Sequence, residues 1–70
     1  MQHYYVNNEE TRNPGLHHEV HTEEHANELR ILSKTYLEAF SNCMDAVIKA
    51  RRIYSDADGC KICCTQCQQE

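Results

Sequence analysis

The choice of fold depends on residues 34 to 50, which read KTYLEAFSNCMDAVIKA. The first seven of them include threonine, tyrosine and phenylalanine, which suit a β-strand. Asn42 can then cap a helix, because Asp45 follows three positions later and resembles a capping box with Asp in place of the usual Glu. These signals predict a strand over residues 34 to 40, followed by a helix that starts at Asn42.

The predicted helix has one apolar face, because apolar residues recur after Asn42 at helical spacing. They are Cys43, Ala46, Val47, Ala50, Ile53 and Tyr54. The polar run from 55 to Gly59 favours a turn, so we expect the helix to end near Tyr54. Met44 and Ile48 point away from this face and are the residues through which a homodimer could form.

Residues 2 to 22 favour two short strands joined by a turn. Aromatic and β-branched residues at positions 4 to 6 suit a strand over residues 2 to 7. The Asn-Pro-Gly sequence at 13 to 15 is typical of a turn, and a second strand over residues 17 to 22 ends near His21. The predicted fold is therefore α+β: a small antiparallel sheet of about three strands, one C-terminal helix and a cysteine knuckle.

An all-α helical hairpin or coiled coil is the alternative, because no Pro or Gly occurs between Leu16 and Ala57. Apolar residues in this range follow the 3-4 spacing of a coiled coil. They are Leu29, Leu32, Tyr36, Ala39, Cys43, Ala46, Ala50 and Ile53. This stripe is thin, since four of the eight positions are Ala or Cys, and Asn42 would interrupt the helix.

The chain has 70 residues and forms one small domain, with an ordered core expected over about 17 to 67 and flexible last residues. A domain this short needs a disulfide, a metal or a partner subunit for stability. The net charge of −4 argues against a general nucleic-acid binder. The first residues lack a secretory signal, and no apolar run approaches the roughly 20 residues of a membrane span. We therefore expect a cytoplasmic protein, in which clustered thiols more often bind metal than pair with each other.

Two short spacings provide metal ligands, His21-x-x-x-His25 and Cys60-x-x-Cys63. Imidazole nitrogen and thiolate sulfur are the ligands of closed, tetrahedral Zn²⁺ sites. The sequence predicts one Zn²⁺ ion bound by these four residues, which would replace part of the missing core. The remaining cysteines are alternative ligands, because they offer further usable spacings. They are Cys43, Cys64 and Cys67.

The motifs resemble those of a family of short bacterial and phage proteins of unknown function. The resemblance covers most of residues 17 to 67 and is carried by His-Glu-Val-His at 18 to 21, Tyr-Leu-x-x-Phe-Ser-Asn-Cys at 36 to 43, Asp-Ala-Val at 45 to 47 and Asp-Gly-Cys-x-x-Cys at 58 to 63. More distantly, the layout is similar to the N-terminal metal-binding domain of the Ada DNA-repair protein and to zinc modules appended to some small nucleases. The resemblance implies that His21, His25, Cys60 and Cys63 are ligands.

The chain departs from both patterns. In the repair domain the first pair is two cysteines, one of which accepts a methyl group, and His at both positions argues against that activity. The short family tends to have Cys near position 25 and His after the last Cys, where this chain has His25 and Gln68. Either change could shift which groups bind the ion.

The sequence favours a non-catalytic zinc module that binds a protein partner. A thiol-redox or redox-sensing protein that uses the cluster from Cys60 to Cys64 is an alternative, because Lys61 between two thiols would lower a thiol pKa. A nucleic-acid-binding accessory module that uses Arg51 and Arg52 is a further alternative.

Overall fold

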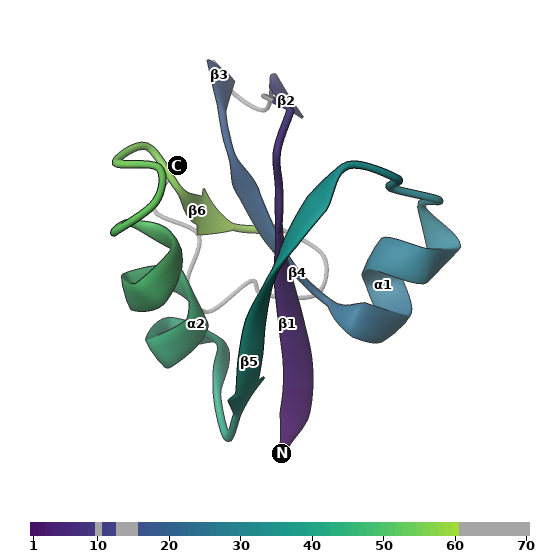
Figure 1. Ribbon diagram of the computed structural model, residues 1–70, viewed down its shortest axis with the longest axis vertical. Coiled ribbons are helices and arrows are strands. Elements are labelled where there is room, and N and C mark those ends of the chain that lie inside the picture. Colours follow the sequence, from purple (N-terminus) through teal and green to yellow (C-terminus); the bar gives the residue numbers. More distant parts are fainter. Residues whose placement is uncertain (10, 13–15, 61–70) are drawn as a thin grey trace.

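The protein folds into a mixed sheet with a helix on either side (Figure 1). The structure is a computed structural model and describes residues 1–9, 11–12 and 16–60. Within these residues the elements follow in the order β1 (Gln2–Asn7), β2 (Thr11–Arg12), β3 (Leu16–His17), β4 (Glu19–Thr22), α1 (Glu23–Glu28), β5 (Lys34–Phe40), α2 (Cys43–Ala50) and β6 (Asp58–Gly59). The α+β prediction is confirmed.

The main sheet has four strands in the order β5-β1-β4-β6. Strand β1 pairs antiparallel with both β4 and β5, whereas β6 pairs parallel with β4. The two short strands β2 and β3 pair with each other and extend the hairpin of β1 and β4 beyond the sheet (Figure 1). The sheet therefore has one strand more than the predicted three, and this additional edge strand, β6, is parallel to its neighbour. The Asn-Pro-Gly turn at 13 to 15 lies outside the described residues.

Helix α1 is a second helix, where the sequence analysis predicted only one. Thr22 caps its first turn by accepting a hydrogen bond from the backbone N–H of His25 at 3.3 Å. The helix ends at Glu28 with Leu29 as its C-cap, and the next residue, Arg30, has a φ of 56° in the left-handed region. The N–H of Arg30 then donates to Asn27, and the N–H of Ile31 donates to Ala26, each at 3.1 Å. This is the Schellman arrangement without its usual glycine, so the sequence carries no clear stop signal.

Helix α2 begins as predicted and ends earlier. Asn42 caps it by accepting a hydrogen bond from the N–H of Asp45 at 3.0 Å. The helix ends at Ala50 rather than near Tyr54. The N–H groups of Arg52 and Ile53 donate to carbonyls three residues back, which tightens the turn after the helix. Ile53 consequently leaves the apolar face and is 48% exposed. None of the described helices is long and apolar enough to cross a bilayer.

The aliphatic core lies between α2 and one face of the sheet. The alternating residues Tyr4, Val6 and Val20 line this face, and Ala46, Val47 and Ala50 of α2 pack against it. The core is also in contact with three partly buried residues, Phe40, Cys43 and Tyr54. Tyr4 and Val6 of β1, which come before position 17 in the sequence, therefore belong to the hydrophobic core.

The all-α alternative is wrong. Residues 34 to 40 form β5, and the coiled-coil positions before them are exposed, with Leu32 at 94% and Leu29 at 50%. These leucines lie outside the aliphatic core and do not form the buried apolar stripe that a coiled coil needs.

A register shift in β5 decides which of its side chains enters the core. Tyr5 pairs with Tyr36, whereas Tyr4 pairs with Glu38, so Leu37 is the extra residue of a β-bulge. Leu37 is fully buried, and Tyr36 remains 47% exposed. Glu38 has a φ of 97°, and its carboxylate pairs with the Lys49 ammonium from α2. The bulge therefore leaves an aromatic side chain on the surface.

Candidate metal centre

Parallel pairing of β4 and β6 brings His21 and Cys60 to the same end of the sheet. Glu19 pairs with Asp58, and the N–H of Cys60 donates to the carbonyl of Val20 at 3.0 Å. Cys60 therefore leaves β6 at the level of His21. Both side chains are buried, with 2% of His21 and 4% of Cys60 exposed. The pairing of β4 with β6 therefore places Cys60 next to His21, although the two residues are far apart in the sequence.

Helix α1 supplies the third member of the cluster. His25 lies in its first turn, where the Thr22 cap holds the backbone, and it is half-buried. Its Nδ1 atom lies 3.6 Å from Sγ of Cys60. Its ring meets the His21 ring edge-on, with centroids 5.4 Å apart. The ligand atoms of the three residues all lie within 4.8 Å of one another, so this group could hold a metal ion.

A buried carboxylate lies beside the cluster. Glu19 precedes His21 by two residues on β4 and is only 8% exposed. Its Oε1 atom is 3.6 Å from Nε2 of His21. A carboxylate in this place is typical of metal sites, where it orients a ligating imidazole. Glu19 was not among the predicted site residues, although the two-residue period of a strand puts Glu19 and His21 on one face.

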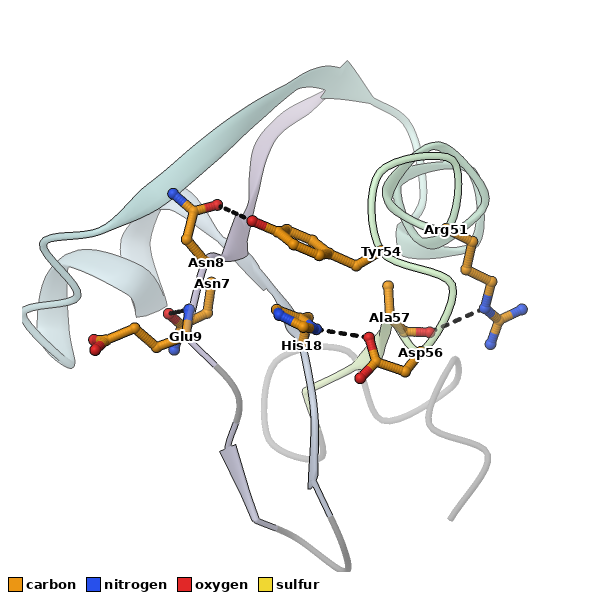
Figure 2. Close-up of polar contacts among 8 residues, drawn as sticks. All are labelled: Asn7, Asn8, Glu9, His18, Arg51, Tyr54, Asp56 and Ala57. Carbon is orange, nitrogen blue, oxygen red and sulfur yellow. Dashed lines mark hydrogen bonds and ion pairs between the residues drawn. The ribbon is translucent and has the colours of Figure 1, made fainter.

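A network around His18 holds the segment that leads to Cys60 (Figure 2). The His18 ring stacks on Tyr54, with centroids 3.8 Å apart, and its Nδ1 lies 2.6 Å from Oδ1 of Asp56. The Tyr54 hydroxyl donates to Asn8 at 3.1 Å, which ties the turn after α2 to the residue that follows β1. The turn after α2 is therefore anchored to the sheet at several points before it enters β6.

Arg51 completes this anchoring. Its Nε donates to the carbonyl of Ala57 at 2.9 Å (Figure 2), and Nη2 lies 3.9 Å from the carboxylate of Asp58. The same carboxylate accepts the N–H of Gly59 at 2.9 Å. One of the two arginines considered for nucleic-acid binding thus has an internal structural role.

The structure brings together three of the four predicted ligands, His21, His25 and Cys60. Cys60 is a thiol, whereas the alternative ligand Cys43 is disulfide-bonded and does not offer a thiolate. The fourth predicted ligand, Cys63, and the alternatives Cys64 and Cys67 lie outside the described residues.

The chain matches no protein-family model, and no curated protein or solved structure matches it significantly. The resemblance described above remains an expectation.

Proposed function

We propose that this chain is a non-catalytic zinc module, in which one Zn²⁺ ion joins α1 to the sheet and shapes a surface for a protein partner. The observation that supports this most strongly is the convergence of His21, His25 and Cys60 from three separate elements.

The distances suit zinc. With bonds of about 2.05 Å to nitrogen and about 2.3 Å to sulfur, a tetrahedral ion places a nitrogen and a sulfur ligand about 3.6 Å apart. Sγ of Cys60 and Nδ1 of His25 are 3.6 Å apart. Since the ligand atoms of the three residues lie within 4.8 Å of one another, small side-chain rotations would close the triangle. Mixed imidazole and thiolate ligands also favour zinc over the hard cations magnesium and calcium.

The position of the cluster explains why a metal would be structural. The aliphatic core lies on the α2 side of the sheet, whereas α1 buries only Ala26. A helix of six residues is too short to be stable by itself. A bond from the ion to His25 would hold α1 in place, and bonds to His21 and Cys60 would hold the edge strand β6. The ion would therefore hold α1 against the sheet, as apolar packing holds α2.

Native mass spectrometry of protein purified without chelator tests the proposal. We expect one zinc ion per chain, lost in His25→Ala and in Cys60→Ser. His3→Ala is the matched control, because it removes an exposed imidazole outside the cluster and should keep the ion. A metal-free wild-type protein, or full zinc occupancy in both cluster variants, would contradict the proposal.

The disulfide at Cys43 favours one second candidate, a thiol-redox protein that uses the cysteines near the C-terminus. This candidate predicts a metal-free chain whose mass rises by the added hydrogens after reduction. A zinc-loaded chain whose metal is unaffected by oxidant would exclude it.

A further inference from the structure

The sheet face toward α1 carries three aromatic rings that α1 leaves partly uncovered. We infer that this ring face, formed by His3, Tyr5 and Tyr36, docks a Lys or Arg side chain from a basic segment of a partner protein. The inference rests on the proposed function, because it names the partner chemistry of the same module.

The three rings form a continuous group on β1 and β5. The Tyr5 and Tyr36 centroids are 5.2 Å apart at an interplanar angle of 52°, and those of His3 and Tyr36 are 5.8 Å apart. Nδ1 of His3 lies 2.7 Å from the Tyr36 hydroxyl, which fixes the relative positions of these two rings. Tyr36 is 47% exposed because the β5 bulge turns Leu37, rather than Tyr36, into the core. The rings are therefore both held in place and accessible.

A small hollow adjoins the rings. Its volume is about 200 Å³, and it is lined by Gln2, His3, Glu23 and Glu24. This is smaller than the roughly 300 to 1,000 Å³ of pockets for drug-sized ligands, so it suits one side chain. His3 is the member of the ring face that lines the hollow, and the Tyr5 hydroxyl contacts Glu23 at its edge. The two carboxylates are groups that attract an ammonium or guanidinium ion.

The local charge selects a cation as the occupant. The Tyr5 hydroxyl donates to Oε2 of Glu23 at 3.4 Å. Loss of solvent, and then the negative charge of Glu23, raise the pKa of the Tyr5 phenol above its ordinary value. The Lys34 ammonium already lies 5.4 Å from the Tyr5 ring centroid, so a ring of this face accepts a cation within the chain itself.

The same charges argue against nucleic acid on this face. Bases can stack on exposed aromatic rings, but their phosphates would then approach Glu23 and Glu24. The net charge of −4 adds to this repulsion and to the attraction of a basic partner.

The ring face is linked to the proposed metal through α1. Glu23 and Glu24 lie in the first turn of this helix, between His21 and His25 in the sequence. An ion bound to both histidines would hold the two carboxylates beside the rings. Removal of zinc should therefore weaken docking.

An NMR titration of the zinc-loaded, ¹⁵N-labelled protein tests the inference. The probe is a capped Gly-Gly-Lys-Gly-Gly peptide, and its control is the same peptide with norleucine in place of lysine. We expect amide shifts to concentrate at His3, Tyr5, Tyr36 and Glu23 with the lysine peptide alone, and to weaken with added salt.

Matched variants locate the site. Tyr36→Leu and the double change Glu23→Gln with Glu24→Gln should each weaken binding about three- to fivefold, from loss of cation–π attraction and of ionic attraction respectively. Glu28→Gln removes a carboxylate from the other end of α1 and should leave the affinity unchanged.

Equal shifts with the norleucine peptide, or tighter binding of oligothymidylate at the ring face, would overturn the inference. If the chain binds no zinc but shows lysine-specific shifts, the docking of lysine at the ring face would be supported and the proposed zinc site would be refuted. Zinc binding without lysine-specific shifts would refute docking alone.

Discussion

Thermal stability should rise steeply with the concentration of free zinc. The proposed ligands His21, His25 and Cys60 come from β4, α1 and the residue after β6. The native fold therefore assembles them, and unfolding separates Cys60 from the histidine pair. A ligand that binds only the native state adds about 1.4 kcal/mol for each tenfold increase above its dissociation constant. In a domain of this size 1 kcal/mol raises Tm by about 4 to 8 °C, so each decade of free zinc should add about 6 to 11 °C.

The assay is far-UV circular dichroism during heating, in metal buffers that set free zinc over several decades. Cys60→Ser removes the thiolate and should move the rise to higher zinc by at least about tenfold, since a hydroxyl is a poor zinc ligand. His3→Ala should follow the wild-type curve, because it lies outside the cluster. A wild-type Tm that does not change with zinc, or an identical curve for Cys60→Ser, would refute the reasoning.

Three further predictions concern the rest of the fold. Leu37→Ala empties a fully buried position and should lower the free energy of unfolding, measured in urea, by about 3 kcal/mol; a loss under about 1 kcal/mol would contradict the described packing. Tyr54→Phe deletes the hydrogen bond to Asn8 and should cost about 1 kcal/mol in the same assay, whereas no loss would mean that water replaces it. Tyr5 should ionise above its ordinary pKa of 10.0 in an ultraviolet titration, and Glu23→Gln should lower that pKa without restoring it fully, because desolvation remains; an unchanged pKa would exclude the influence of Glu23. Since the folded state holds the Tyr5 proton more tightly, this contribution to stability is present below pH 10 and is lost as pH rises through the raised pKa.

Local signals were enough to predict the elements on either side of Asn42. Strand β5 spans the predicted residues 34 to 40, and the Asn42 cap has the expected hydrogen bond to the N–H of Asp45. Both features depend on a few neighbouring residues. The predicted end of α2 near Tyr54 was wrong. Arg52 and Ile53 change to three-residue hydrogen bonds, and the Tyr54 hydroxyl bonds the distant Asn8, neither of which the local sequence indicates.

Elements that depend on distant partners could not be predicted in this way. Strand β6 has only two residues, Asp58 and Gly59, whose composition favours a turn, and its strand pairing comes from β4 about forty positions earlier. Helix α1 ends at Glu28, and the left-handed residue that follows its cap is Arg30 rather than glycine, so its end has no sequence signal. Both elements are shaped by tertiary contacts.

The candidate site shows the same division. The short His-x-x-x-His and Cys-x-x-Cys spacings pointed to His21, His25 and Cys60, which the structure brings together. The burial of Glu19 beside His21 follows from the parallel pairing of β4 with β6, which the sequence does not reveal. Residue type therefore predicts the ligands, and topology determines the surroundings that orient them.

X-ray absorption at the zinc edge of the purified, unmodified chain measures the ligand set most directly. The proposed centre predicts a first shell that contains nitrogen at about 2.0 to 2.1 Å together with sulfur at about 2.3 Å. Loss of part of the nitrogen signal in His25→Ala would assign one imidazole to this residue. A shell of sulfur alone, or of light atoms alone, would contradict a centre built from His21, His25 and Cys60.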